Sequence, residues 1–200
     1  MKLLGFGIFF VSVIAGCNEK QTATIRPADP HYTVDIPETI PVDQWPDSND
    51  LETTIFYDIE TGKTKPEEIV TFANSLIGTK YQYGSIDPKV GFDCSGFITY
   101  VFNHYNIKVP RSSVDFTDVG KPVTVEEAKP GDIILFTGTN PTIRRVGHMG
   151  IVNKTFSGDD LEFIHSSSGK AYGVTLSSLS SHYKDRFVKV IRIFTQNDRN

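Results

Sequence analysis

The spacing of apolar residues changes once along the chain, and this change constrains the fold more than any other feature. Within residues 64–78 and 94–105, apolar side chains recur three and four positions apart, which predicts two amphipathic helices. Beyond residue 130, the apolar residues form short runs that predict strands. The predicted strands are 131–136, 147–153, 161–166 and 187–194. Helices followed by strands favour an α+β fold, in which a small antiparallel sheet packs on the second helix.

Both predicted helices have recognisable starts. Thr64 and Glu67 have the spacing of a capping box at the start of the first helix, which a glycine ends. Asp93 is placed to cap the second helix, so that Cys94 or Ser95 becomes its first residue. The sequence therefore predicts that Cys94 lies at a helix N-terminus.

The N-terminal segment has the pattern of an export signal. Lys2 precedes the almost wholly apolar residues 3–14, and this run is too short to span a bilayer. Residues 14–17, Ile-Ala-Gly-Cys, resemble a bacterial lipobox. The resemblance implies that residues 1–16 are a lipoprotein signal peptide and that Cys17 is lipidated, which would anchor the chain to a membrane. An ordinary secretory signal cut nearby is the alternative.

Composition divides the rest of the chain in two. Residues 17–62 hold five of the 11 prolines and no sustained periodicity, which predicts a lipidated cysteine followed by an extended linker. Residues 55–57 are a candidate arm that packs on the folded part. With 38% hydrophobic and 12% aromatic residues, the chain can build one core, which we assign to a domain at 63–197.

The net charge argues against nucleic-acid binding, and the cysteine content leaves one free thiol to explain. A net charge of −4 and the lack of a basic cluster argue against nucleic acid as a partner. The chain has two cysteines, so a lipidated Cys17 leaves Cys94 as a single thiol without an intramolecular disulfide partner. A free thiol in an exported protein needs a chemical explanation.

Cys94 is placed for nucleophilic chemistry. The free N–H groups and dipole of a helix N-terminus favour the thiolate, and the same N–H groups can hold an oxyanion. Ser95 and Gly96 carry little bulk that would shield this turn. The alternative is that Cys94 is a small buried apolar residue at a helix start.

Two of the five histidines are candidates for the base. His148 and His165 lie within apolar strand patterns, unlike the others. If their strands form a hairpin that turns at 155–158, Val152 faces Leu161 and His148 faces His165, with Cβ atoms ~5 Å apart. One imidazole would then take the thiol proton while the other orients it. The alternative is two unrelated strand histidines. The remaining histidines are His31, His104 and His182.

Five blocks of sequence occur in a distinctive order and spacing. They are GTKYQYGS at 78–85, GFDCSGF at 91–97, VPRSS at 109–113, KPGDIILF at 129–136 and GHMGI at 147–151. Together they resemble the NlpC/P60 family of papain-like cell-wall cysteine peptidases, over about 67–194. The resemblance implies a papain-like α+β fold, with N-terminal helices that present the cysteine against a curled antiparallel sheet of five or six strands.

The resemblance also implies the roles of three residues. Cys94 would attack an amide carbonyl, His148 would act as base and then acid, and His165 would orient His148. Acylation of the thiol would give a thioester that water resolves. Such a mechanism requires no metal and no cofactor.

Further residues match family positions near the nucleophile. The hydroxyl of Tyr81 would help position substrate or oxyanion, and Asp93 and Ser95 would contact the free amine or the acyl part of the substrate. Tyr81 as a packing residue and Asp93 as a helix cap only are the alternatives. Arg111 and Asp132 also fit family blocks, but salt bridges or turn caps explain them equally well, so we leave both out of the site.

The function implied is hydrolysis of amide bonds in the stem peptides of peptidoglycan. The γ-D-glutamyl to diaminopimelate bond is the first candidate and a D-alanyl to diaminopimelate cross-link the second. A related thiol acyltransferase or amidase, and a non-catalytic wall-binding lipoprotein, are the alternatives. We expect a monomer anchored in the cell envelope through Cys17. Asn18 favours the outer membrane, on its periplasmic side.

Overall fold

The computed structural model describes residues 57–156 and 160–198, together with the backbone of 22–23 and 40–41. The chain divides into two units, Met1–Thr53 and Thr54–Asn200. In the first unit, β1 (Thr22–Ala23) and β2 (Ile40–Pro41) form a short antiparallel ladder. The predicted signal peptide, Cys17 and most of the predicted linker lie outside the described residues.

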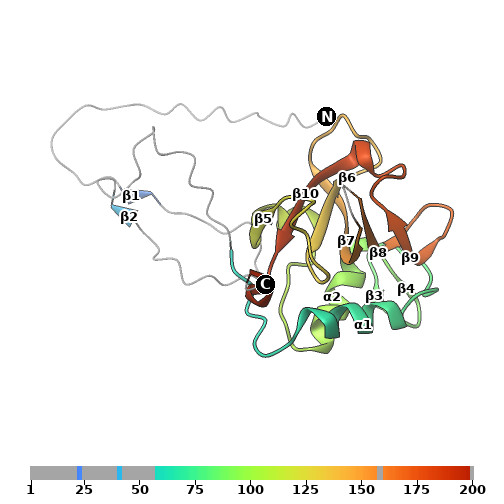
Figure 1. Cartoon of the computed structure of the whole chain (residues 1–200), viewed down its shortest axis with the longest axis horizontal. Helices are drawn as coiled ribbons and strands as arrows, with labels where there is room; N and C mark the ends of the chain where they lie inside the picture. Colours follow the sequence, from blue (N-terminus) through green and yellow to red (C-terminus); the bar gives the residue numbers. More distant parts are fainter. Residues whose placement is uncertain (1–21, 24–39, 42–56, 157–159, 199–200) are drawn as a thin grey trace, which may run out of the picture. The chain divides into compact units, whose positions relative to one another are not determined.

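The second unit combines two helices with a six-stranded antiparallel sheet (Figure 1). The helices are α1 (Pro66–Ser75) and α2 (Cys94–His104), and a short hairpin, β3 (Ile86–Asp87) and β4 (Gly91–Phe92), lies between them in the chain. In spatial order the sheet consists of β5 (Lys121–Val123), β10 (Phe187–Arg192), β6 (Ile133–Thr137), β7 (Val146–Thr155), β8 (Leu161–Ser167) and β9 (Gly173–Ser178). Short 3₁₀ helices are η2 (Ser113–Asp118), η3 (Lys184–Arg186) and η4 (Thr195–Asp198). The predicted α+β fold is confirmed.

The four predicted strands correspond to β6, β7, β8 and β10, whereas β5 and β9 were not predicted. The two missed strands are the edges of the sheet. An edge strand needs no buried apolar run on both faces and tolerates proline, which β5 contains at Pro122. Their sequences therefore lack the pattern by which the inner strands were recognised.

The start of α1 differs from the prediction by one residue. Lys65 is the N-cap, and its backbone N–H donates to Glu68 Oε2 at 2.8 Å. Pro66 occupies the first helical position, where its missing N–H leaves no intrahelical bond unmade. The capping pair predicted at Thr64 and Glu67 was therefore wrong by one position.

The candidate arm at 55–57 is described only at Tyr57. Its N–H donates to the Asp118 carbonyl at 2.8 Å, and its carbonyl accepts from the Gly120 N–H at 2.9 Å. Tyr57 thus forms a parallel bridge with Val119 and brings the start of the folded unit against the segment before β5.

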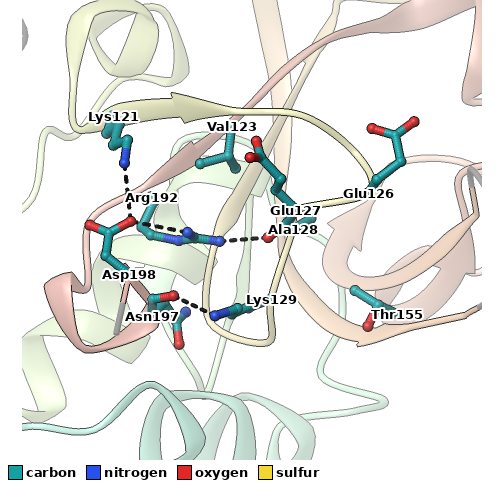
Figure 2. A pocket seen from close by; sticks show the side chains of 10 residues that line it. All are labelled: Lys121, Val123, Glu126, Glu127, Ala128, Lys129, Thr155, Arg192, Asn197 and Asp198. Carbon is teal, nitrogen blue, oxygen red and sulfur yellow. Dashed lines mark hydrogen bonds and ion pairs between the residues drawn. The ribbon is translucent and has the colours of Figure 1, made fainter. Parts of the chain in front are cut away.

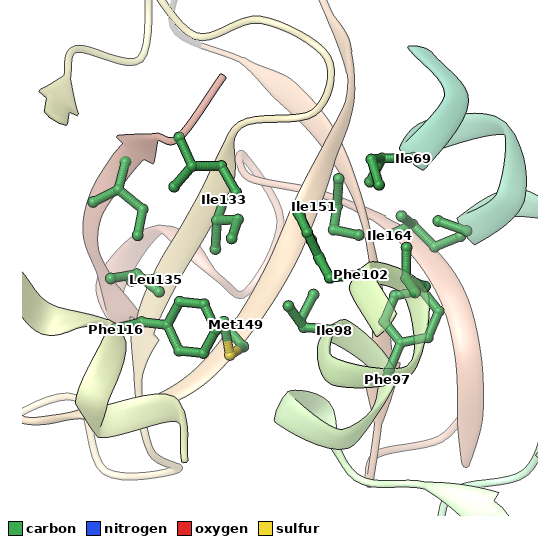
Figure 3. Close-up of a cluster of buried hydrophobic side chains, with 14 of the residues drawn as sticks. Ile69, Phe97, Ile98, Phe102, Phe116, Ile133, Leu135, Met149, Ile151 and Ile164 are labelled. Carbon is green, nitrogen blue, oxygen red and sulfur yellow. The ribbon is translucent and has the colours of Figure 1, made fainter. Parts of the chain in front are cut away.

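Apolar side chains form the core that fixes α2 on the sheet (Figure 3). Figure 3 shows side chains of α2 facing those of β6 and β7. The fully buried members from these three elements are Phe97, Ile98, Val101, Phe102, Ile133, Leu135, Met149 and Ile151. Burial of each contributes about 1.5–3 kcal/mol, so the helix that begins at Cys94 is held firmly against the strand that carries His148.

A buried ion pair joins β10 to the turn before β6. Asp132 is fully buried and accepts from Arg192 Nε at 3.2 Å and Nη2 at 2.9 Å. Its carboxylate also accepts from Asn197 Nδ2 at 3.2 Å and the Lys129 N–H at 2.9 Å. The carboxylate is thereby compensated by a buried salt bridge and hydrogen bonds, the kind of contact that the sequence analysis offered as an alternative to a role in the site.

Loss of this carboxylate is expected to destabilise the fold strongly. Asp132→Ala should lower the free energy of unfolding by about 3–5 kcal/mol, because Arg192, only 7% exposed, keeps its charge without its main partner. Asp198→Ala is the matched control, since its 36% exposed carboxylate binds the outer side of the same guanidinium and is expected to contribute less than about 1 kcal/mol. Urea unfolding of both variants measures the difference, and equal small losses would contradict this account.

A polar pocket of about 560 Å³ lies beside this pair (Figure 2). Its cationic side chains bind the chain itself: Arg192 donates to the Glu127 carbonyl at 2.7 Å, Lys129 to the Asn197 carbonyl at 2.6 Å, and Lys121 pairs with Asp198 at 3.2 Å. None of the predicted site residues lines it. We therefore assign these contacts to stability.

Candidate active site

Cys94 is the first residue of α2, as predicted. Asp93 is the N-cap, and its Oδ1 accepts from the Gly96 N–H. A Cβ at Gly96 would lie 2.1 Å from the Ser85 carbonyl oxygen, so only glycine lets this loop approach the helix. The start of the helix is thus fixed on both sides of the thiol.

The thiol is less acidic than the sequence suggested. Burial raises the pKa of Cys94 to about 11, and the Asp93 carboxylate adds to the rise. Hydrogen bonds from the N–H groups of Ser95 and Cys94, and the charge of Arg111, act in the opposite direction. The N–H groups of the helix N-terminus therefore lower the pKa of Cys94, as expected, but burial raises it by more.

His148 and His165 meet directly. His148 Nε2 and His165 Nδ1 lie 2.8 Å apart, and the ring planes are at 82°. On its other side, His165 Nε2 lies 3.0 Å from Ser177 Oγ. A chain of two hydrogen bonds thus runs from β7 through β8 to the edge strand β9.

The pairing that brings the histidines together differs from the predicted one. Val152 pairs with Phe163 and not with Leu161, and the register shifts between Val152 and Lys154. The strands are therefore displaced by two residues, and His148 is a diagonal neighbour of His165. Diagonal positions lie on the same face, within reach of long side chains, so the imidazoles still meet.

Both imidazoles are neutral near pH 7. Burial, together with smaller effects of Arg186 and His182, lowers the pKa of His165 to about 3. Burial also lowers the pKa of His148, followed by the effects of His165, Arg186 and His182. Near pH 7 both imidazoles are therefore able to accept a proton.

An aromatic enclosure holds the histidine pair. Tyr183 is 3% exposed, and its ring stacks on His148 at 5.8 Å and meets the edge of His165 at 5.2 Å. Phe136 packs near His148, and Phe163 near His165. Burial raises the pKa of Tyr183, a hydrogen bond with Ser167 and the charge of Arg186 lower it, and Cys94 adds a small increase. No sequence signal marked Tyr183, which lies outside the predicted strands.

Arg111 organises the residues that flank Cys94. Its guanidinium forms an ion pair with Asp93 at 2.9 Å and donates to Ser95 Oγ, also at 2.9 Å. The same Asp93 oxygen, Oδ2, also accepts from the Gly84 N–H at 2.8 Å. Asp93 and Ser95 therefore lie beside the thiol as predicted, with polar groups already bound to the chain. This cluster was visible in the sequence only as separate motif residues.

Tyr81 lies on the same side of the site. Its backbone N–H donates to the Tyr172 carbonyl at 2.9 Å, and it forms a parallel bridge with Phe92, two residues before Cys94. Burial raises the pKa of Tyr81, and Cys94 and Asp93 raise it further. The phenol is thus close enough to sense charge on the thiol.

Within the described residues, no group of three or more His, Cys, Asp or Glu could hold a metal ion. No helix in this part of the chain has the length and apolar character to cross a membrane.

Comparison with known proteins gives the family. The NlpC/P60 family profile matches residues 78–192, and the chain belongs to the NlpC/P60 family. This range includes the six residues predicted from the sequence for catalysis or substrate binding, which are Tyr81, Asp93, Cys94, Ser95, His148 and His165.

Several relatives carry names that describe hydrolysis. The chain is 37% identical over 141 residues to the gamma-DL-glutamyl hydrolase of Bacillus subtilis, a match covering 68% of this chain but 32% of that protein. It is 30% identical over 139 residues to the probable endopeptidase NlpC homolog of Haemophilus influenzae, covering 67% of this chain and 68% of the homolog. The chain thus spans about a third of the Bacillus relative and two thirds of the Haemophilus one.

Solved structures agree on the fold. A Staphylococcus aureus protein described as similar to lipoprotein, of the NLP/P60 family, superimposes with a TM-score of 0.53 at 28% sequence identity. The match covers 70% of this chain and 43% of that chain.

The pKa of Cys94 leads to a test of the resting site. Because the thiolate is the reactive form, alkylation of Cys94 by iodoacetamide is expected to be slow at pH 7 and to rise about tenfold per pH unit up to about pH 10. Mass spectrometry of the peptide that contains Cys94 separates this thiol from Cys17. A fast rate that stays constant between pH 6 and pH 8 would show a preformed thiolate and contradict the neutral site.

Proposed function

We propose that this chain is a cysteine endopeptidase that hydrolyses amide bonds in the stem peptides of peptidoglycan. The observation that carries the proposal is the 2.8 Å contact between His148 and His165 in a domain whose Cys94 begins a helix. The names of the relatives, an endopeptidase and a glutamyl hydrolase, support the reaction class.

Acylation begins with the thiol. Cys94 Sγ attacks the amide carbonyl carbon while its proton passes to His148. Because Nε2 of His148 is bound to His165, Nδ1 is the nitrogen that receives the proton. The N–H groups at the start of α2 stabilise the oxyanion, with the Tyr81 hydroxyl beside them. When the tetrahedral intermediate collapses, the C–N bond breaks, His148 protonates the leaving amine, and a thioester remains on Cys94.

Deacylation repeats the proton transfers with water. His148 Nδ1 takes a proton from the water that attacks the thioester carbonyl, and the C–S bond then breaks to release the acid and the thiol. His165 stays neutral throughout and holds the His148 ring in place. No step requires a metal or a cofactor.

The first candidate for the bond that is hydrolysed is the γ-D-glutamyl to diaminopimelate bond. The name of the Bacillus relative, which describes glutamyl hydrolysis, supports this choice. In this proposal Asp93 and Ser95 contact the part of the substrate on the acyl side of the bond. Arg111 neutralises much of the Asp93 charge, so these contacts act more through hydrogen bonds than through charge.

The bond is identified with two purified substrates, a stem tetrapeptide and a cross-linked dimer. Hydrolysis of the tetrapeptide at diaminopimelate, with the dimer cross-link left intact, is the expected result in mass spectra. Cleavage of the cross-link alone would assign the D-alanyl bond instead. Transfer of the acyl group to an added amine would favour a transferase, and binding without new termini would favour a wall-binding role.

We also propose that residues 1–16 are a lipoprotein signal peptide, that 17–62 are the lipidated cysteine and linker, and that 63–197 are the catalytic domain. The lipid on Cys17 would hold the enzyme in the cell envelope, at the periplasmic side of the outer membrane. The lipoprotein description of the Staphylococcus relative supports an anchor. Palmitate labelling that is lost in Cys17→Ala is expected, and labelling that persists would exclude this anchor.

A further inference from the structure

The histidine pair raises the question of which ring nitrogen carries each proton. A neutral imidazole has one N–H donor and one bare nitrogen acceptor. Between His148 Nε2 and His165 Nδ1, 2.8 Å apart, one nitrogen must therefore donate and the other accept. The proton positions on the two rings are linked, because fixing one end of the pair fixes the other.

Ser177 lies at the far end of the pair. Its Oγ is 3.0 Å from His165 Nε2, on a strand that pairs Ser177 with Phe163 and Thr175 with His165. Ser177 is thus a diagonal neighbour of His165, on the same face of the sheet. A hydroxyl can donate or accept, so two proton arrangements are compatible with these distances.

The two arrangements differ in what they leave on His148. If Ser177 donates to His165 Nε2, then His165 Nδ1 carries the proton and donates to His148 Nε2. His148 must then carry its own proton on Nδ1, where no lone pair remains for the thiol. If Ser177 accepts, His165 Nε2 carries the proton and donates to Ser177 Oγ. His165 Nδ1 is then bare and accepts from His148 Nε2–H, which leaves His148 Nδ1 bare.

We propose that Ser177 is a positioning residue whose oxygen accepts from His165 Nε2–H and so holds His148 with a bare Nδ1. The inference rests on the proposed function, because a bare Nδ1 matters only if His148 takes a proton from Cys94. The arrangement also suits the imidazolium formed during attack, since His148 Nε2–H then points at a lone pair of His165. Ser177 acts through His165 and touches no reacting atom.

Nitrogen-15 NMR of the histidine side chains in the purified protein tests the assignment directly. Bare and protonated ring nitrogens have well-separated ¹⁵N shifts. At pH 7 the wild-type protein is expected to show His148 protonated on Nε2 and bare on Nδ1. A His148 protonated on Nδ1 would overturn the proposal. This readout needs no substrate, so it stands apart from any failure of the proposed function.

Variants of β9 supply the kinetic test. Ser177→Ala is expected to lower kcat about tenfold with KM unchanged, and to give a mixture of His148 tautomers. Ser177→Thr keeps the hydroxyl and should restore both. Thr175→Ala is the matched control, because Thr175 is paired with His165 but its hydroxyl bonds to the Leu176 carbonyl at 3.4 Å. An unchanged kcat and tautomer in Ser177→Ala would overturn the proposal.

Discussion

Replacement of Cys94 by alanine is expected to reduce turnover by about 10⁴-fold or more. Without Sγ no thioester can form, and the helix N-terminus that remains can only polarise the carbonyl. The fold should persist, because the change removes one sulfur atom from a partly buried position while Asp93 still caps α2. Product release measured by chromatography, together with the thermal unfolding midpoint, separates the two effects.

The second cysteine provides the control for this variant. Cys17→Ala should leave the catalytic rate of the purified protein unchanged, because Cys17 lies outside the domain that we propose to be catalytic. If Cys94→Ala kept wild-type turnover, or if Cys17→Ala abolished it, Cys94 would not be the nucleophile.

Replacement of His148 by glutamine is expected to lower kcat by about 10³-fold or more. Glutamine keeps a polar group near His165, but its amide cannot accept the thiol proton. Because the pair is neutral in the resting site, no preformed thiolate compensates for the lost base. Single-turnover kinetics should show slow acylation.

His182→Gln is the matched control for this loss. His182 is exposed, and its ring packs on Tyr183 at 4.2 Å without a hydrogen bond to the pair. Its variant should stay within about twofold of wild type. An equal loss in both variants would mean that the enclosure, and not the base, limits the rate.

Local sequence patterns predicted the parts of the site that depend on residues close together in the chain. Asp93 and the apolar spacing after it were enough to place Cys94 at a helix start, because a cap and an amphipathic face are both short-range features. The inner strands were recognised for the same reason. The motif blocks then identified the family that the profile match confirms.

The register of β7 and β8 could not be read in this way. Asn153 lies where the register shifts, and its side chain joins Asn74 of α1 at 2.6 Å and Glu162 of β8 at 2.7 Å. The contact with Asn74 joins segments 79 residues apart in the chain, which the sequence of the hairpin alone does not reveal. The predicted turn at 155–158 also began too early, because Thr155 is still paired, with Leu161. The longer connection and the irregularity together leave the strands displaced by two residues from the prediction.

The residues that surround the predicted site were missed for a similar reason. Tyr183 and Ser177 act through contacts made only in the folded chain, and Arg111, which was considered and left out of the site, forms its ion pair with Asp93. The acidity of Cys94 was also misjudged, because the sequence shows the helix start but not the depth of burial. Motifs identify the reacting groups, whereas their electrostatics depend on packing.

The central claim is that Cys94 makes this NlpC/P60 domain a peptidase of the bacterial wall. Mass spectrometry of the soluble products, after incubation of purified peptidoglycan with the wild-type protein and with Cys94→Ala, tests it most directly. The account predicts new amine termini on stem peptides with the wild-type protein and none with the variant. New termini that appear equally with both proteins, or a folded wild-type protein with a reactive Cys94 that releases none, would contradict it.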